Sequence, residues 1–380
     1  MDSYDVVIIG GGPAGSSCAS ELRRSGLKAA VVDRHVFPRN KVCGGWITPA
    51  VFEELEIQPA EYAQGRLLQP ITGFRTSHMG GREVETHFGK PVSYGIRRFE
   101  FDHYLLQRCG ATLHFGEALT HLERAGGSWV INQRLRSKIL VGAGGTFCPV
   151  ARFLGAKMSR EMAVTAQEAE FEMNAGQLSE CSIRGEMPEL YFCSDMKGYG
   201  WCFRKHNVLN VGLGRLDRSR LSSHVEDFLN FLKVNRKLSP DLPSALPGHA
   251  YLLYSQTTRD PVGEGVLLIG DAAGVSYAQS GEGIRPAIES GLLAAKVIAD
   301  ADGNYSRERL DPYGDLLVKR FGRAESNWLA RIGQRVPTRV VNPLARRLLQ
   351  TDWFAREVVL KSWFLRQNEQ PLRPSQAFSP

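Results

Sequence analysis

YDVVIIGGGPAG, residues 4–15, decides the fold of this chain. An apolar run typical of a buried strand leads directly into glycines at positions 10, 12 and 15. Gly10 permits a tight turn, Gly12 lets the backbone approach a pyrophosphate, and Gly15 lets the following helix lie close to the sheet. An anionic ligand at this turn would meet unpaired N–H groups at the start of the helix. The stretch therefore predicts a dinucleotide-binding strand, turn and helix.

A second apolar run, AAVVD, strengthens this interpretation. It ends at Asp33, 18 positions after Gly15. A carboxylate at the end of the second strand can accept hydrogen bonds from ribose hydroxyls. We therefore favour a nucleotide site over a glycine-rich turn that binds nothing.

Composition limits the class of protein. With 380 residues and 43% hydrophobic content, the chain can bury a large core and form about two or three domains. Its N-terminus carries Asp2 and Asp5 instead of a basic segment, so the first apolar run is a strand and not a signal peptide. Its seven cysteines show no CxxC pair or metal-ligand spacing. We expect a cytoplasmic protein with reduced thiols and no metal.

The net charge of +7 is concentrated near the C-terminus. Residues 301–380 contain 14 Lys and Arg against 8 Asp and Glu, and Trp328, Trp353 and Trp363 lie among them. Basic helices with aromatics are typical of a membrane surface, which we favour over nucleic acid as the anionic partner. The alternative is a helical cap whose aromatics pack inward and whose charges are merely solvated.

A second ligand-binding pattern appears late in the chain. GVLLIGDAAG, residues 265–274, reads as a strand and an acidic turn, and Ile284, Ile288 and Leu292 then recur at helical spacing. Two distant segments that grip one ligand require a long ligand, and FAD is the obvious candidate. Asp271 would bond the ribityl chain, and the helix beginning near Gly283 would direct its positive end at the flavin.

Strand patterns divide the chain between two folding units. Residues 160–255 hold β-rich runs that predict a separate antiparallel sheet. The expected fold class is α/β, or α+β overall: a Rossmann-like FAD-binding domain, an inserted antiparallel β-sheet substrate domain and a helical C-terminal segment. The expected boundaries are FAD-binding domain 1–75, 96–157 and 256–305; substrate domain 76–95 and 158–255; C-terminal segment 306–380.

Several motifs together resemble a known superfamily. The glycine fingerprint, RxxFD from Arg98 to Asp102, and GDAAG followed by GEGI are similar to the flavin monooxygenases and reductases typified by p-hydroxybenzoate hydroxylase. Within that superfamily, KVCGGWITP, residues 41–49, resembles the KxCGG signature of the geranylgeranyl reductase family. YGWCFRK, residues 199–205, is similar to that family's YxWxFPK stretch, with Arg204 in place of the proline.

The resemblance implies a set of site residues. Cys43 would lie near the flavin and act in catalysis, and a cation beside it, such as Lys41, can lower the pKa of a thiol. The expected substrate contacts are Gly45, Trp46, Tyr199, Trp201 and Phe203, whose aromatic rings could alternatively be plain core. The expected FAD contacts are Gly10, Gly12, Pro13, Ala14, Gly15, Asp33, Arg34, Cys43, Gly44, Arg98, Gly270, Asp271, Gly281, Gly283 and Ile284. Arg98 could alternatively be a surface ion pair with Glu100 or Asp102. Glu282, one residue before the helix that would face the flavin, is either merely a helix-terminal charge, which we favour, or a direct participant in the chemistry.

The resemblance implies an FAD-dependent oxidoreductase that reduces carbon–carbon double bonds of an isoprenoid or other long apolar substrate. One alternative is a monooxygenase of an aromatic or polyketide substrate, which the absence of the hydroxylase-type Asp-Gly carboxylate at Gly144-Gly145 weakens. A second alternative is a flavin electron-transfer or accessory module. No second GxGxxG identifies the electron donor, so NAD(P)H and a protein reductant both remain open.

Overall fold

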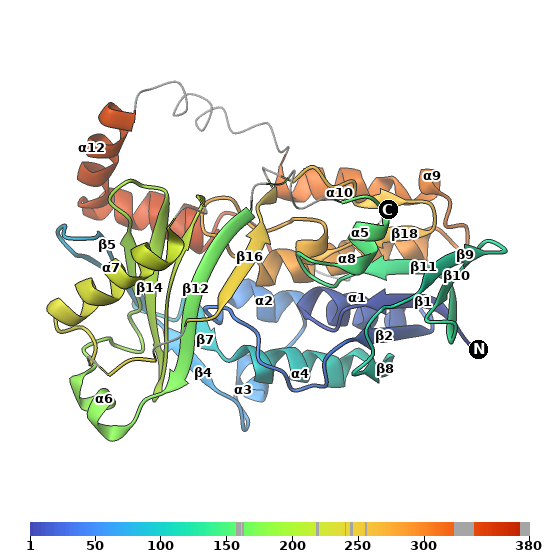
Figure 1. Cartoon of the computed structure of the whole chain (residues 1–380), viewed down its shortest axis with the longest axis horizontal. Helices are drawn as coiled ribbons and strands as arrows, with labels where there is room; N and C mark the ends of the chain where they lie inside the picture. The colour runs from blue at the N-terminus through green and yellow to red at the C-terminus, as the bar shows by residue number, and fades with distance from the viewer. Residues whose placement is uncertain are drawn as a thin grey trace.

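The structure of the chain is a computed structural model that describes residues 1–156, 161, 163–217, 220–239, 241–243, 246–254, 257–322 and 338–372. Within these ranges the strands form three sheets, which we call the first, second and small sheets. Figure 1 shows the first sheet on the right and the second sheet on the left, with α8 reaching toward the region between them.

The first sheet is built around the N-terminal strand. β1 (Asp2–Ile9) pairs in parallel with β2 (Ala29–Asp33) on one side and with β11 (Leu135–Gly142) on the other. All five residues of β2 are buried, as expected for a parallel strand covered on both faces. Three further strands belong to this sheet: β8 (Thr112–Phe115), β17 (Val262–Gly263) and β18 (Val266–Leu268). The main path runs in the order β17, β18, β11, β1, β2 and β8. The antiparallel pair β9 (Leu122–Ala125) and β10 (Ser128–Ile131) extends the sheet beside β11.

Two helices that follow the two sequence motifs pack against each other beside this sheet. α1 (Pro13–Arg24) follows the glycine turn, and α8 (Ile284–Asp300) follows the second motif. They pack so closely that a Cβ at Gly291 would collide with the carbonyl oxygen of Ala14. Because the helices touch through their backbones, the two distant motifs are held side by side.

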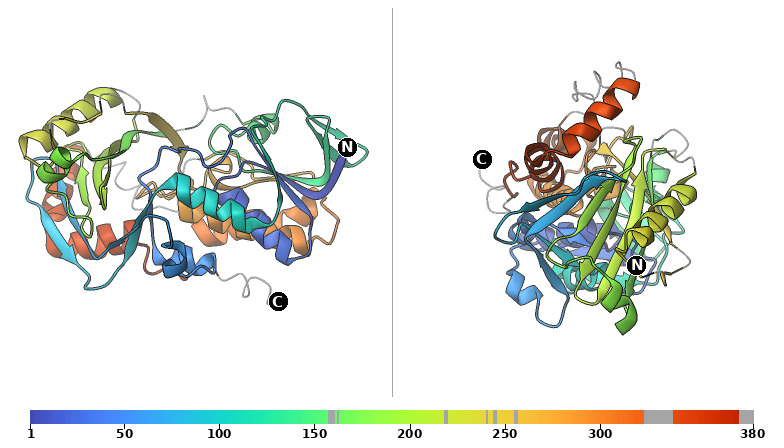
Figure 2. Two further views of the ribbon diagram at one scale, coloured as in Figure 1. Left: turned by 90° about the horizontal axis from the view of Figure 1, so that it is seen from below. Right: turned by 90° about the vertical axis from the view of Figure 1, so that its left-hand side faces the viewer.

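The second sheet is mainly antiparallel and has two apolar faces. Side chains alternate along its strands: Leu190 and Trp201 face one cluster, whereas Tyr191 and Cys202 face the other. Figure 2 shows α7 (Leu221–Val234) on one face and the C-terminal helices on the other. The sheet contains β5 (Gly73–His78), β6 (Val84–His87), β12 (Ala163–Glu172), β13 (Glu189–Phe192), β14 (Gly198–Lys205), β15 (Val208–Arg215) and β16 (Gly248–Leu252).

The small sheet carries the end of the KxCGG loop. β7 (Ser93–Ile96) pairs with β3 (Trp46–Ile47) and with β4 (Leu68–Ile71). β7 then leads into α4 (Arg98–Cys109), which begins with the RxxFD motif. The other helices are α2 (Pro49–Glu54), α3 (Pro59–Tyr62), α5 (Pro149–Phe153), α6 (Ala175–Glu180), the 3₁₀ turn η3 (Gly270–Ala272), α9 (Arg307–Leu310), α10 (Pro312–Phe321), α12 (Thr338–Leu349) and the π-helix η4 (Phe354–Phe364).

The C-terminal helices divide their aromatic residues between core and surface. Phe364 of η4 is 2% exposed and packs on Trp46 and Tyr199, whereas Trp353 is 67% exposed. Trp328 lies outside the described residues. No helix in the described ranges is long and apolar enough to cross a lipid bilayer.

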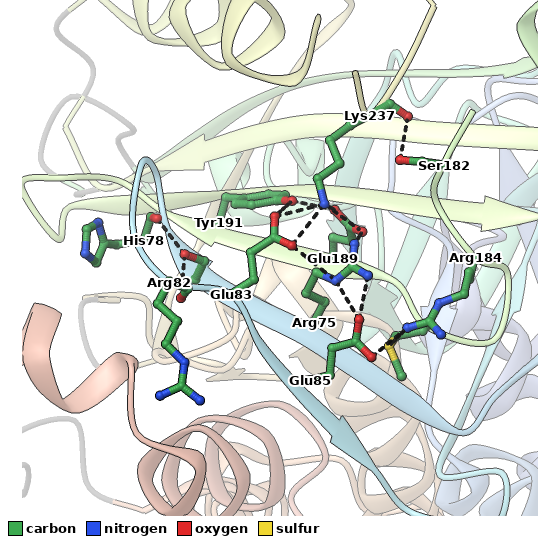
Figure 3. Close-up of polar contacts among 12 residues, drawn as sticks. Arg75, His78, Arg82, Glu83, Glu85, Ser182, Arg184, Glu189, Tyr191 and Lys237 are labelled. Carbon is green, nitrogen blue, oxygen red and sulfur yellow. Dashed lines mark hydrogen bonds and ion pairs between the residues drawn. The ribbon is translucent and has the colours of Figure 1, made fainter. Parts of the chain in front are cut away.

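A network of charged groups joins the far edge of the second sheet to the segment after α7. Lys237 Nζ lies 2.8 Å from Glu83 and 3.3 Å from Glu189, and Arg75 pairs with the same two carboxylates (Figure 3). The Tyr191 hydroxyl donates to Glu83 at 3.0 Å. Because Glu189 is almost fully buried, these contacts are what makes its charge tolerable there.

Candidate functional site

The glycine turn has the geometry that a nucleotide phosphate needs. Gly10 has φ +120°, and a Cβ there would collide with the Ala143 carbonyl oxygen. A Cβ at Gly15 would collide with the Gly10 carbonyl oxygen, so α1 can approach the strand only with glycine here. Gly12 is the N-cap of α1, Pro13 and Ala14 begin the helix, and no side chain caps its N-terminus. Its first N–H groups therefore remain available to an anion.

Asp33 is oriented for a further ligand. Its Oδ2 accepts the Gly11 N–H at 2.8 Å and its Oδ1 accepts the His35 N–H at 2.9 Å. A carboxylate has about four lone-pair positions, so it retains capacity for ribose hydroxyls. The neighbouring Arg34 side chain is exposed. The end of β2 thus supplies one fixed acceptor beside the glycine turn.

The second motif forms a loop that meets α8. Gly270 has φ +61°, and its N–H is held by the Ser290 hydroxyl of α8 at 2.9 Å. Asp271 accepts the Ser276 hydroxyl at 3.0 Å through Oδ1. Gly283 is the N-cap of α8, again without a capping side chain, and Ile284 is its first residue. Asp271 and the open helix end therefore lie together at this loop.

Arg259 supports this loop from beneath. Its guanidinium donates to the Ala272 carbonyl at 2.9 Å and to the Thr146 carbonyl at 2.8 Å. It also pairs with Glu161 at 2.8 Å, and both side chains are almost fully buried. No local pattern predicts this contact, because the partners are distant in the chain.

Arg98 is a buried group and not a surface ion pair. Its guanidinium makes two bonds to Asp102, of 2.8 and 2.9 Å, and the side chain of Cys43 lies within its electrostatic reach. Only 8% of Arg98 is exposed, and Asp102 is inaccessible. The buried carboxylate beside it holds the pKa of Arg98 above its ordinary value despite the desolvation that opposes this. RxxFD therefore places a permanent cation at the Cys43 loop.

The Cys43 loop is bonded to the second sheet beside Trp201, on the face that also carries Leu190. Asn210 of β15 donates its amide N–H to the Cys43 carbonyl at 3.2 Å, and its oxygen accepts the Trp201 indole N–H at 2.7 Å. A Cβ at Gly44 would lie 3.2 Å from the Phe203 ring. Gly45 has φ +61°, and a Cβ there would collide with the Ile96 carbonyl. Gly45 is thus required for this path of the loop, and Gly44 lets the loop lie close to Phe203.

The predicted aromatic residues gather beside this loop. Tyr199 and Trp201 have ring centroids 5.9 Å apart, and the Tyr199 hydroxyl donates to the Ser280 carbonyl of the second motif. Trp46 packs against Phe74 and Phe364. Gly281 has φ +69°, and a Cβ there would collide with the Tyr251 hydroxyl. The structure therefore brings KxCGG, YGWCFRK and GEGI together, as the sequence led us to expect of one site.

Ionisable groups around the loop have shifted pKa values. Burial is the main cause that raises the pKa of Glu168 to about 7, and Lys205 opposes the shift. Burial and the Lys41 charge lower the pKa of His249 to about 4, so its ring is neutral beside the Lys41 ammonium. The Lys41 Nζ contacts that ring at 3.2 Å. Lys41 thus contacts His249, and both Lys41 and Arg98 lie within electrostatic reach of Cys43.

Asn210, Glu168, His249 and Tyr251 belong to this site but were missed by sequence reasoning. They lie on antiparallel strands, where every second residue faces the same side. Nothing in the local pattern shows which residue meets the Cys43 loop. One signal does mark the face of the second sheet that carries Trp201. In VLNVGLG of β15, the small residues Gly212 and Gly214 lie beside that ring.

Residues 3–318 match the family model described as FAD binding domain. The chain is 28% identical to a digeranylgeranylglycerophospholipid reductase of Methanococcus vannielii, covering 82% of this chain and 81% of that protein. It is 30% identical to a menaquinone reductase of Mycobacterium tuberculosis, covering 86% and 82%.

The fold is also shared with a solved structure. A geranylgeranyl bacteriochlorophyll reductase-like protein from Thermoplasma acidophilum superposes with a TM-score of 0.78 at 22% identity, over 95% of this chain and 96% of the other. The likeness extends over both sheets and the C-terminal helices, because it covers nearly the whole of each chain.

Proposed function

The chain belongs to the FAD binding domain family, and on that premise we propose that it is an FAD-dependent reductase of the geranylgeranyl reductase type. Its substrate would be an isoprenoid or another long apolar molecule with carbon–carbon double bonds. The relatives named above support this choice of reaction class.

The observation that carries the proposal is the position of the Cys43 loop. Arg98 lies within electrostatic reach of its side chain, and Asn210 donates to its carbonyl from the aromatic face of the second sheet. One short loop therefore touches both the nucleotide-binding half of the molecule and the aromatic residues. A flavin ring near Cys43 would face a surface that suits an alkene.

The residues present fit FAD. We assign the pyrophosphate to the N-terminus of α1, the adenosine ribose to Asp33 and the ribityl chain to Asp271. The open N-terminus of α8 would stabilise negative charge on the ring. When bound, the cofactor supplies hydride chemistry, and the protein supplies orientation, electrostatics and exclusion of water.

The substrate would lie along the aromatic residues. We assign contacts to Gly45, Trp46, Tyr199, Trp201 and Phe203. Their rings offer flat apolar surface. We assign Cys43 to the reacting bond, where its thiol can position the alkene or carry a proton.

The source of electrons and the approach to the lipid are further parts of this proposal. NAD(P)H or a protein reductant would reduce the flavin. Peripheral contact with a membrane would occur through the basic C-terminal segment, where Leu344 is 58% exposed and Trp353 67% exposed.

Product analysis tests the proposed reaction. Purified holoenzyme is reduced chemically without oxygen and incubated with geranylgeranyl diphosphate. The molecular mass of the product is then measured by mass spectrometry. We expect the product to gain two hydrogen atoms for each reduced double bond. Unchanged substrate, or a product that contains added oxygen once air is admitted, would contradict the proposal.

A further inference from the structure

Glu282 is a buried carboxyl group at the junction of the two halves of the site. It directly precedes Gly283, the N-cap of α8, and only 8% of the residue is exposed. Neither of its side-chain oxygens has a hydrogen-bond partner within the described part of the chain. Because burying an unpartnered polar group is costly, a group like this usually has a ligand to meet.

The surroundings of Glu282 connect it with the proposed substrate face. Tyr199 of β14 lies within electrostatic reach of both Glu282 and Cys43. The Tyr199 hydroxyl is itself engaged, since it donates to the Ser280 carbonyl. Glu282 on the α8 loop and Cys43 on the KxCGG loop therefore both lie within electrostatic reach of one aromatic residue of the proposed substrate face.

Charged groups on each neighbouring element influence Glu282. Burial is the main cause that raises its pKa to about 8, Glu289 of α8 adds to the rise, and Arg285 and Arg366 oppose it. Tyr277, in the preceding turn, also lies within electrostatic reach. The group is thus neutral near pH 7, while two guanidinium groups are close enough to stabilise the carboxylate after a proton leaves.

Other acids near the proposed site are less suited to give up a proton. Burial raises the pKa of Tyr199 and Tyr251 above the ordinary value for a phenol. The His249 ring is neutral, with a pKa lowered to about 4. Glu168 interacts with the Cys43 amide, Asn210 and Lys205. Glu282 combines a proton at neutral pH with the absence of a partner among the described residues.

We propose that Glu282 is the proton donor in the reduction of the alkene, an inference that rests on the proposed reductase function. The bound cofactor supplies a hydride to one alkene carbon. The π-electron pair forms the second C–H bond with the proton of Glu282, and the O–H bond breaks to leave a carboxylate. The carboxylate regains a proton from water, and the electron donor, NAD(P)H or a protein reductant, restores the reduced cofactor.

Glu282→Gln tests this role because it keeps the size of the side chain and removes the acid. The variant and the wild-type holoenzyme are photoreduced without oxygen and mixed with geranylgeranyl diphosphate across a pH series. We expect the variant to bind FAD normally and to be reoxidised at least about 100-fold more slowly. The wild-type rate should fall as pH rises through about 8, the pKa of this group. Glu282→Asp should restore part of the rate together with that pH dependence.

Infrared titration gives a readout that does not depend on turnover. Wild-type holoenzyme should show the C=O stretch of a protonated carboxyl that disappears as pH rises through about 8, and Glu282→Gln should lack it. Glu308→Gln is a matched control, since Glu308 is likewise a glutamate near the start of a helix but is exposed. It should behave as wild type in both experiments.

Each outcome decides the inference. If the wild-type enzyme reacts with the alkene and Glu282→Gln reacts equally fast with the same pH profile, Glu282 is not the donor and the reductase function stands. If the carboxyl band is missing from the wild type, the donor role is also wrong. If the wild-type enzyme reacts with no alkene, the proposed function fails, and this inference fails with it.

Discussion

At the scale of single residues, buried groups act on both the side chain and the backbone of Cys43. Arg98 lies within electrostatic reach of the side chain, and Asn210 donates to the carbonyl. Arg98 is in turn held by two bonds to the inaccessible Asp102. Because each holding group is buried and already bonded elsewhere, the loop has little freedom to move. Such support is what a group beside a reacting bond requires.

Cys43→Ala tests the role of the thiol. The substitution leaves the Asn210 bond to the backbone intact, so we expect normal FAD content. Turnover of the alkene should fall by about 10² or more if the thiol carries or orients a proton. The flavin absorbance spectrum and the rate of alkene-dependent reoxidation measure the two effects. Unchanged FAD content together with unchanged turnover would refute the assignment.

The residues that could be predicted best from the sequence are those whose role follows from their local backbone conformation. Gly10 and Gly15 were predicted from the turn itself, and their φ angle and close backbone contacts agree with that reason. Arg98 was expected either at the flavin or in a surface ion pair; it is a buried partner of Asp102, and its contact with the flavin stays a prediction. Asn210 could not be predicted, because its importance comes from a neighbour 167 positions away.

At the scale of elements, the charged network of the second sheet connects its edge to the segment after α7. Lys237 has a 10% exposed side chain, and it contacts Glu83 and the 2% exposed side chain of Glu189 (Figure 3). Its loss would leave a buried carboxylate with fewer compensating charges. The stability of a buried charged network depends on every partner being present.

Lys237→Met should therefore destabilise the protein. We expect the free energy of unfolding in urea to fall by about 3–5 kcal/mol, the typical result of breaking a buried ion pair. Arg307→Met is the control, because Arg307 pairs with Asp260 in the open, with side chains 53% and 55% exposed. That control should change stability little. Equal effects of the two substitutions would contradict the structural role of the network.

Elements with strong periodicity were predictable, and those that depend on packing were not. The long helix after Gly283 was expected from Ile284, Ile288 and Leu292, and it is α8. The π-helical form of η4 was not expected, because nothing in FAREVVLKSWF distinguishes it from an α-helix. Its place against Trp46 and Tyr199 depends on contacts from far along the chain.

At the scale of the whole molecule, the C-terminal segment is both a structural and a surface element. Phe364 is buried against the second sheet, so deleting the segment would expose the core. Leu344 and Trp353 are exposed and can be changed separately. The inward-packing interpretation therefore concerns Phe364, and the predicted membrane contact concerns Leu344 and Trp353.

Leu344→Ser combined with Trp353→Ser tests membrane contact. We expect the double variant to associate more weakly with anionic liposomes in a sedimentation assay, with an unchanged flavin spectrum. Added salt should weaken wild-type association as well, because the segment is basic. Val234→Ser on α7 is the control, since Val234 is 81% exposed on the other face of the second sheet. Association of the double variant equal to wild type would reject the contact.

The buried carboxyls also give stability a defined dependence on pH. The pKa of Glu282 is about 8 in the folded protein, whereas an unfolded Glu has about 4.3. Between these values the folded protein keeps a proton that the unfolded chain releases, so this group lowers stability as pH rises. The Tm of Glu282→Gln relative to wild type should increase from about pH 5 to about pH 8 and then level off. A constant difference would show that Glu282 is charged when folded.

The measurement that tests the central claim most directly is flavin reoxidation without oxygen. The holoenzyme is photoreduced anaerobically, geranylgeranyl diphosphate is added, and the flavin absorbance is followed. Our account predicts that the flavin is reoxidised by the alkene while oxygen is absent. Reoxidation that begins only when oxygen is admitted would contradict a reductase and favour a monooxygenase.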